Sequence, residues 1–405
     1  MPDLDLPVEF RAEIMQPLIS TLTKGESCSL VGVGSSGKSN VARHLLRADV
    51  RQYYLKDAAA STLSVYVDCA KLSEYSFPHL YGLLLEALVS AAPEAEPQVA
   101  ALCSRLEALW EQAVGSGVPD RARRSLEGAV ELVRQAGVDQ LFILLDDFDH
   151  VVQRAPAPLL NSLRALRDNH KSHLMYATFT RRELGFLRKP DEYQDLYEIA
   201  SHMTLAIGPY REMDASFMVD RLTYRWQAPQ RLSDAERYKV LKLAGCHAGL
   251  LKAILWAIPR GDLVSPLPDL VEKLRGHGDI EPECAKIIES LEAEEVIDLR
   301  ALVGDGQLVG EGIRPLERKG VLRPRPEGGY GIFSPLFADF VRDRFAPRSA
   351  GEAPRQRPAQ DWSKLNSVER GLLEFLRAHA GQPVARQALI VKMHESEESS
   401  HASAH

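Results

Sequence analysis

The segment Gly32-Val33-Gly34-Ser35-Ser36-Gly37-Lys38-Ser39 constrains the fold of this chain more than any other part of the sequence. It matches the pattern G-x-x-x-x-G-K-[ST], follows the apolar residues 28–33 and precedes the helical pattern of residues 40–46. Gly34 and Gly37 allow backbone N–H groups to turn inward around phosphate oxygens, and the helix that follows adds its positive N-terminal end. A glycine-rich turn with an accidental lysine is the alternative. The strand-loop-helix context favours a phosphate-binding loop.

Each residue type in this segment has a chemical role. The Lys38 ammonium can reach the β- and γ-phosphates, and the Ser39 hydroxyl can coordinate Mg²⁺. We therefore expect the nucleotide to be bound by Gly32, Val33, Gly34, Ser35, Ser36, Gly37, Lys38, Ser39 and Asn40. The chain has no N-K-x-D motif of the kind that reads guanine in GTPases, so adenine is the preferred base.

A second apolar run ends in two carboxylates. Residues 141–147 read Leu-Phe-Ile-Leu-Leu-Asp-Asp. Asp146 would hold Mg²⁺ directly or through water, and Asp147 would orient and deprotonate an attacking water molecule. The alternative is a solvated acidic turn, which Asp149 would extend. The phosphate loop and the acidic strand end together favour the catalytic interpretation.

Residues 1–208 alternate short apolar runs with amphipathic helical patterns, which predicts an α/β fold with a parallel sheet and crossover helices. We expect strands at residues 27–33, 63–68, 140–146, 173–178 and 202–207. Their centres are apolar throughout, as in strands that are buried on both faces. Between the second and third strands we expect a helical insert that contains residues 80–89, 99–109 and 126–135.

With both motifs in place, the chain resembles the P-loop ATPases of the additional-strand class, close to the STAND ATPases and to archaeal, origin-initiator-like AAA+ ATPases. This resemblance implies a three-layer α/β core, bound ATP or ADP, and Mg²⁺. Residues 10–14, with Leu18 and Leu22, resemble the leading segment that lies against adenine in this family, which implies that Phe10 and Arg11 contact the base.

Two further segments resemble parts of the same family. Residues 173–181 resemble the fourth strand, which ends in a polar residue and an arginine facing the γ-phosphate; this implies a role for Arg181, with Thr178 or Thr180 as the polar residue. A plain surface arginine is the alternative. Residues 244–251 resemble the lid motif that starts a helix and contacts the base. This implies that His247 lies at the start of that helix and binds the nucleotide, with a catalytic base as the alternative role; Ala248 stands where the family usually has proline.

The rest of the chain divides by composition and periodicity. We expect a P-loop ATPase core at 1–208, a helical lid at 209–277 and a winged helix at 278–345, the last from three helices followed by a hairpin. Asp214 and Ser233 are predicted helix N-caps. Residues 346–360 read as a linker, residues 361–394 as part of a winged helix-turn-helix, and residues 395–405 as a disordered tail.

The winged helix has two interpretations. Residues 311–325 carry Arg314, Arg318, Lys319, Arg323 and Arg325 against two glutamates, a net charge of +3 that could contact DNA phosphates. The alternative is a unit that packs on the lid as an internal brace. Residues 365–389 resemble the beginning of a response-regulator-type winged helix-turn-helix, without the helix that would read bases; a two-helix hairpin that packs on a protein surface is the alternative.

Composition excludes other classes of protein. With 49 basic and 56 acidic residues the net charge is -7, so no global positive field would attract nucleic acid. No run approaches the roughly 18 apolar residues that a membrane span needs. The first residues lack the features of a signal peptide, and the five cysteines form no CxxC pair. We expect a cytoplasmic protein with reduced cysteines.

Two functions follow as hypotheses. The first is a slowly hydrolysing, ATP-dependent regulatory switch that forms homo-oligomers when ATP is bound and presents its winged-helix modules to DNA or to a protein partner. The second is a non-catalytic scaffold for protein interactions, stabilised by a bound nucleotide. A small-molecule kinase is disfavoured, because the chain shows no acceptor-binding motif.

Overall fold

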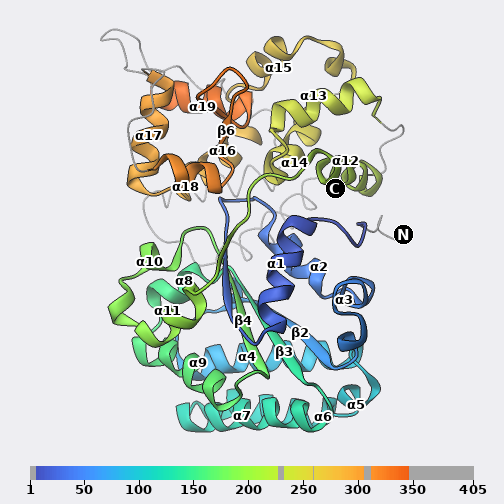
Figure 1. Ribbon diagram of the computed structural model, residues 1–405, viewed down its shortest axis with the longest axis vertical. Coiled ribbons are helices and arrows are strands. Elements are labelled where there is room, and N and C mark those ends of the chain that lie inside the picture. Colours follow the sequence, from blue (N-terminus) through green and yellow to red (C-terminus); the bar gives the residue numbers. More distant parts are fainter. Residues whose placement is uncertain (1–5, 227–231, 259, 305–311, 346–405) are drawn as a thin grey trace, which may run out of the picture. The chain divides into compact units, whose positions relative to one another are not determined.

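The computed structural model describes residues 6–226, 232–258, 260–304 and 312–345. The predictions for 346–360, 361–394 and 395–405 lie outside these residues. The first part of the chain forms a five-stranded sheet in the order β2-β3-β4-β1-β5, in which every neighbouring pair is parallel (Figure 1). The strands are β1 (Cys28–Val31), β2 (Thr62–Asp68), β3 (Gln140–Asp146), β4 (Leu174–Thr180) and β5 (Thr204–Ala206). Each lies within two residues of its predicted bounds.

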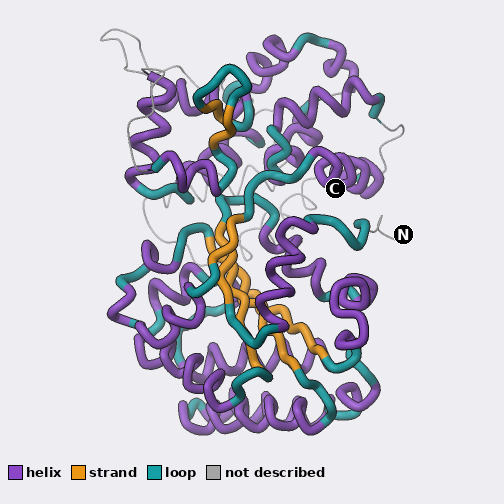
Figure 2. Tube along the Cα trace, in the orientation of Figure 1, coloured by secondary structure: helices purple, strands orange, loops and turns teal. Residues whose placement is uncertain are grey.

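Helices cover both faces of the sheet (Figure 2). Alternate residues of β3 point to opposite faces: Leu141, Ile143 and Leu145 pack in one hydrophobic cluster, whereas Phe142 and Leu144 pack in another. This alternation follows from the two-residue repeat of a strand. The predicted three-layer α/β architecture is confirmed.

The two helical layers differ in size. One face carries α1 (Ala12–Thr23), α2 (Lys38–Leu45) and α3 (Ala48–Leu55). The other face carries α4 (Phe77–Ala91), α5 (Pro97–Ala100), α6 (Cys103–Ser116), α7 (Pro119–Gln135), α8 (Asp149–Arg154), α9 (Ala157–Asn169), α10 (Leu184–Leu187) and α11 (Gln194–Ser201). The predicted insert between the second and third strands corresponds to α4–α7.

After the sheet, the described residues are mostly helical. They comprise α12 (Glu212–Arg225), α13 (Asp234–Ala244), α14 (Ala248–Ala257), α15 (Leu267–Leu274), α16 (Ile280–Glu289), α17 (Ala293–Gly304), α18 (Ile313–Arg318), the antiparallel hairpin β6 (Leu322–Pro324) and β7 (Tyr330–Ile332), and α19 (Pro335–Phe345). The three helices and the hairpin predicted for 278–345 are present, and α19 is an addition. One hydrophobic cluster contains residues from α12 through α19, so the boundary between lid and winged helix stays a prediction.

The two predicted N-caps have different outcomes. Ser233 caps α13 in a capping box with Glu236, as the sequence predicts. Asp214 is not a cap, because α12 begins two residues earlier, at Glu212. Its buried carboxylate instead accepts a hydrogen bond of 3.4 Å from the backbone N–H of Arg11, 203 residues away. A long-range contact therefore replaces the expected local one.

No helix within the described ranges is both long enough and apolar enough to cross a membrane. All five cysteines are free thiols, in agreement with the expectation from their spacing.

Candidate phosphate-binding site

The loop between β1 and α2 has a strained, tightly packed backbone. Ser35 and Gly37 have φ angles of +56° and +94°, in the left-handed region. A Cβ atom at Gly37 would lie 2.7 Å from the Tyr210 hydroxyl oxygen, so glycine is required there for space as well as for conformation. The loop ends where α2 begins, at Lys38. The first N–H groups of α2 have no acceptor inside the helix and are available to an anion.

Lys38 is buried at the base of this loop. Its ammonium donates to the carbonyl oxygens of Gly32 (2.7 Å) and Val33 (3.1 Å). Burial lowers the pKa of Lys38 to about 8, although the nearby carboxylates, first among them Asp149, act in the opposite direction. A phosphate group would add negative charge close to this buried ammonium and stabilise its charged form.

The two carboxylates at the end of β3 have different surroundings. Asp146 is buried, and its oxygens accept hydrogen bonds from the Tyr66 hydroxyl (2.7 Å) and from the Asp147 N–H (3.1 Å). Asp147 has a φ of +49° and lines a cavity beside the loop. Burial, and then the adjacent charge of Asp146, raise the pKa of Asp147, which suits a group that accepts a proton.

Tyr66 connects this acidic end to α2, a link that the sequence reading missed. The Tyr66 ring lies under the Arg43 guanidinium, whose carbon is 5.3 Å from the ring centroid. Arg43 lines the same cavity as Asp147. A period-two pattern places Tyr66 on β2, but only the register between β2 and β3 brings it to Asp146.

The end of β4 contributes Arg181 but neither threonine. Arg181 lines the cavity, and its backbone N–H donates to the buried Asp149 carboxylate at 2.9 Å. Thr178 and Thr180 are fully buried and do not line it. Their hydroxyl groups donate to the Ser29 hydroxyl and to the Arg182 carbonyl. A role for either threonine as the polar residue that senses phosphate stays a prediction.

The cavity has a volume of about 1030 Å³. Of the predicted site residues, the cavity is lined by Ser35, Ser36, Gly37, Lys38, Ser39, Asn40, Asp147 and Arg181. Gly32, Val33, Gly34, Asp146, Phe10, Arg11 and His247 lie outside the lining. The cavity therefore brings together residues of the loop and the residues that directly follow β3 and β4.

Phe10 and Arg11 are buried behind the cavity wall. Phe10 packs against the rings of His44 and Tyr210, with centroids 5.5 and 5.4 Å apart. The Arg11 guanidinium lies 5.0 Å from the Tyr210 ring centroid and donates to the Gly208 carbonyl at 3.0 Å. In this arrangement both side chains support Tyr210, and a contact with adenine stays a prediction.

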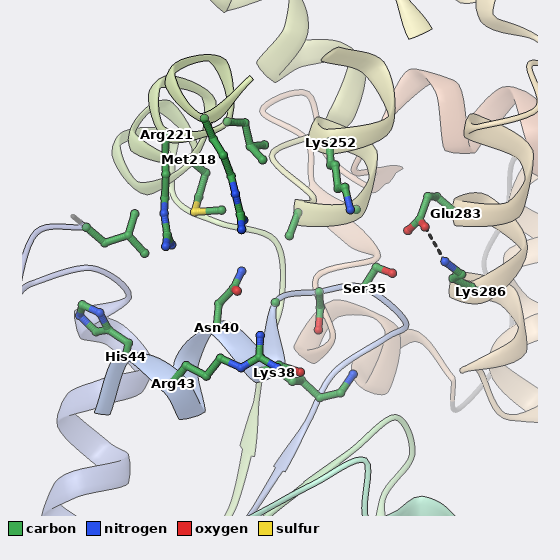
Figure 3. Close-up of a pocket in the computed structure, with 18 of the residues that line it drawn as sticks. Ser35, Lys38, Asn40, Arg43, His44, Met218, Arg221, Lys252, Glu283 and Lys286 are labelled. Carbon is green, nitrogen blue, oxygen red and sulfur yellow. Dashed lines mark hydrogen bonds and ion pairs between the residues drawn. The ribbon is translucent and has the colours of Figure 1, made fainter. Parts of the chain in front are cut away.

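Other residues supply the apolar end of the cavity. Leu6, Met218 and Leu222 line it, together with Arg221 and other cations. Figure 3 shows Met218 and Arg221 pointing from α12 towards Asn40 and His44. The sequence could have indicated that these residues lie together, because positions 218, 221 and 222 share one face of a helix. Which face of α12 meets the loop depends on tertiary packing.

The loop is also held from the side of α14. The His247 Nδ1 accepts the Leu250 N–H at 3.4 Å and so caps α14, while its Nε2 lies 3.1 Å from the Gly34 carbonyl oxygen. With Nδ1 as acceptor, these bonds require the proton on Nε2. Burial lowers the pKa of His247 to about 4. The Gly249 N–H donates to the Ser35 carbonyl at 3.0 Å. The predicted position of His247 at a helix start is thus confirmed.

Helix α16 meets the same loop. The Ser290 hydroxyl, just after α16, accepts the Gly34 N–H at 2.8 Å. A Cβ atom on Gly34 would lie 2.7 Å from the Lys286 carbonyl oxygen, so the loop and α16 are in close backbone contact. Glu283 and Lys286, also on α16, line the cavity. Nothing in the sequence motifs points to these two side chains.

Three of the five cations in the basic segment 311–325 contact other parts of the chain. Lys319 is buried and forms a 2.7 Å ion pair with the buried Glu295. Arg318 lies 3.6 Å from Glu183, and Arg323 donates to the Gly245 carbonyl at 2.9 Å. These contacts reduce the charge that the segment could offer to DNA phosphates, and they favour the brace interpretation.

The residues present fit Mg²⁺. Hard oxygen donors suit this ion, which usually binds through one or two carboxylates, a hydroxyl and phosphate oxygens. Ser39 at the head of α2 and the buried carboxylate of Asp146 supply such donors. Within the described part of the chain, no group of three or more His, Cys, Asp or Glu side chains could hold a metal ion by itself.

No protein-family model matches this sequence, and no curated protein matches it either. Similar solved structures include the Walker-type ATPase PABY2304 of Pyrococcus abyssi (16% identity, TM-score 0.49, 82% of this chain and 95% of that chain). Others are the Aeropyrum pernix ORC2 protein in its ADP form (14% identity, TM-score 0.47, 85% and 96%) and the Aeropyrum pernix ORC1 protein in complex with DNA (17% identity, TM-score 0.42, 85% and 94%).

The fold itself follows from the topology. The phosphate loop follows β1, the acidic pair follows β3, and the additional strand β4 lies between them. This chain has the P-loop fold of the additional-strand class. The resemblance to STAND ATPases and that of residues 365–389 to a response-regulator-type domain remain predictions.

Proposed function

We propose that this protein binds ATP and ADP with Mg²⁺ and hydrolyses ATP slowly, as a regulatory switch. One observation carries the proposal: the phosphate loop and the acidic end of β3 line or border the same cavity of about 1030 Å³. The volume is at the upper end of the range for small-molecule sites. Asp147 lines the cavity, and so do nine residues of the loop, of α2 and of the segment just after α2: Ser35, Ser36, Gly37, Lys38, Ser39, Asn40, Arg43, His44 and Arg47.

The base would lie at the apolar end of the cavity. Leu6, Met218 and Leu222 are aliphatic side chains there, and they offer a flat ring apolar contacts beside the Arg221 guanidinium. The phosphates would lie against the first turn of α2. This placement assigns the base contact to α12 and Leu6, instead of to Phe10, Arg11 and His247.

The catalytic groups act around the terminal phosphate. Ser39 and Asp146 would hold Mg²⁺, which when bound neutralises charge on the phosphate oxygens. Tyr66 holds the Asp146 carboxylate in place through its 2.7 Å hydrogen bond. Asp147 orients a water molecule and accepts its proton, and Lys38 and Arg181 stabilise the charge that develops on the phosphate.

The output of the switch lies in the contacts of α14 and α16 with the loop. Gly34 and Ser35 bond to Ser290, His247 and Gly249, so a ligand that alters the loop also alters these helices. We propose that the ATP-bound form self-associates and acts on a protein partner or on DNA. The scaffold alternative retains a bound nucleotide but shows no turnover.

Two substitutions test the proposal. Lys38→Ala should reduce ATP and ADP affinity at least about tenfold, because it removes the buried cation beneath the phosphates. Asp147→Asn should retain binding and reduce phosphate release by about 10²-fold or more. Nucleotide affinity is measured by calorimetry and turnover by phosphate release.

Lys171→Ala is the control, because Lys171 is exposed and lies outside the cavity. Unchanged ATP affinity in Lys38→Ala would contradict the site assignment. Binding without any turnover in the wild type would support the scaffold instead.

A further inference from the structure

Helix α16 places an ion pair inside the nucleotide cavity. The Lys286 ammonium donates to the Glu283 carboxylate at 2.6 Å, and both residues line the cavity. The Glu283 side chain is 16% exposed and that of Lys286 is 45% exposed, so the acid is the more enclosed partner. Burial would raise the pKa of Glu283, but the hydrogen bonds from Lys286 and Ser35 outweigh it, and the pKa is lowered. Glu283 is therefore an anion at neutral pH.

The carboxylate lies directly against the phosphate loop. A Cβ atom on Gly249 would overlap a carboxylate oxygen of Glu283 and would lie 2.6 Å from the Ser35 Cβ, so these three residues meet at one point. In Figure 3, His44 and Met218 lie on one side of Ser35 and Lys38, and Glu283 and Lys286 lie on the other. With the base at Met218, Glu283 is at the distal end of the phosphate chain.

The charge of Glu283 opposes that of a terminal phosphate. Among the described residues that line the cavity, Asp147 and Glu283 are the only acids. Asp147 has a role in hydrolysis, whereas Glu283 belongs to a helix outside the core. Two negative groups within a few ångströms, partly shielded from water, repel each other strongly enough to change binding constants.

We infer that Glu283 is a specificity-determining residue: while α16 is packed on the phosphate loop, Glu283 makes the site bind the diphosphate more tightly than the triphosphate. The inference rests on the proposed nucleotide site. A diphosphate ends short of Glu283 and leaves its pair with Lys286 intact. A third phosphate competes with Glu283 for Lys286 and is repelled by the carboxylate, so ATP binds with α16 displaced from the loop.

The test compares affinities for ADP and for the non-hydrolysable β,γ-imido analogue of ATP, in the full chain and by calorimetry. Wild type should bind ADP more tightly than the analogue. Glu283→Gln removes the charge and keeps the shape, so it should raise affinity for the analogue about tenfold while ADP affinity changes less than about twofold. Glu283→Asp keeps the charge and should keep the preference for ADP.

Glu281→Gln is the matched control, because Glu281 is exposed on the same helix and does not line the cavity. The ratio of the two affinities should not change in this variant. Melting temperatures without nucleotide confirm that each variant folds. An equal change for both nucleotides in Glu283→Gln, or an unchanged ratio, would overturn the inference and leave the nucleotide site standing.

Binding measurements with and without Mg²⁺ test whether Glu283 acts on the metal instead of on the phosphate. If Glu283→Gln weakens binding of the analogue only when Mg²⁺ is present, Glu283 supports the metal and the inference is overturned. Failure of the wild type to bind either nucleotide would instead overturn the proposed function, and with it this inference.

Discussion

Several residues around the loop have unusual pKa values or unusual backbone angles. Lys38 has a lowered pKa, Asp147 a raised one, and both Ser35 and Asp147 have positive φ angles. Such departures are costly, and they persist because neighbouring contacts hold them in place. Their concentration at one cavity is the reason to regard it as the functional site.

His247 gives a prediction about stability at this scale. Its pKa is about 4 in the folded chain against an ordinary value of 6.5, because burial disfavours the charged ring; Glu283 raises the pKa and Lys38 lowers it. Between pH 6.5 and 4 the unfolded chain binds more protons than the folded one, so the free energy of unfolding falls as the pH falls. This contribution reaches about 2–3 kcal/mol at pH 4.5.

The measurement compares wild type with His247→Asn in chemical denaturation at pH 7 and pH 4.5. Asparagine can still cap α14 but does not titrate in this range. The loss of stability between the two pH values should be smaller in the variant by about 2–3 kcal/mol. Equal losses in both proteins would show that His247 is not buried as a neutral ring.

At the scale of elements, α14 and the loop each approach α16 at a glycine that has no room for a side chain, Gly249 and Gly34. Gly249 lies in the first turn of α14, where a Cβ atom would overlap Glu283 and crowd Ser35. Alanine normally stabilises a helix interior relative to glycine by about 0.5–1 kcal/mol. Here the clash should dominate, and Gly249→Ala should destabilise the protein by about 1–3 kcal/mol.

Gly128→Ala is the matched substitution, because a Cβ atom on this α7 residue would meet only the Leu109 side chain, at 3.9 Å. It should be neutral or stabilising. The check is the free energy of unfolding of both variants in urea. A stable Gly249→Ala variant would mean that α14 does not rest on the loop in solution.

The sequence predicted the elements of the sheet well and the helical half less completely. Strands such as β3 are short apolar runs that end in polar residues. This pattern can be recognised in the sequence without knowledge of the tertiary structure. Helix α19 was missed, and Asp214 was taken for a cap when its carboxylate meets the backbone of Arg11. Local patterns predict where a helix lies better than where it begins or what it contacts.

At the scale of the whole molecule, the loop contacts α14 and the end of α16, and the proposed function predicts that a ligand on the loop is coupled to these helices. Displacement of α16 by a third phosphate would expose surfaces now covered, which favours assembly. We expect the mass in solution to rise with the β,γ-imido analogue and Mg²⁺ and to stay at one chain, 45.0 kDa, with ADP or without nucleotide.

Light scattering after size separation checks this expectation. Lys38→Ala should show the same mass in all three conditions, at nucleotide concentrations that leave its weakened site largely empty. One mass for the wild type in all conditions would contradict assembly driven by ATP, although it would leave nucleotide binding untouched.

The sequence by itself determined the phosphate loop, the acidic strand end and the order of strands and helices, because these depend on residue types at short spacings. It could not place Tyr66 beside Asp146, Met218 at the end of the cavity, or Glu283 against Ser35. The last of these pairs is separated by almost 250 residues. Such contacts are decided only when burial of apolar faces sets how the helices pack on the sheet, because no local preference of the backbone encodes them.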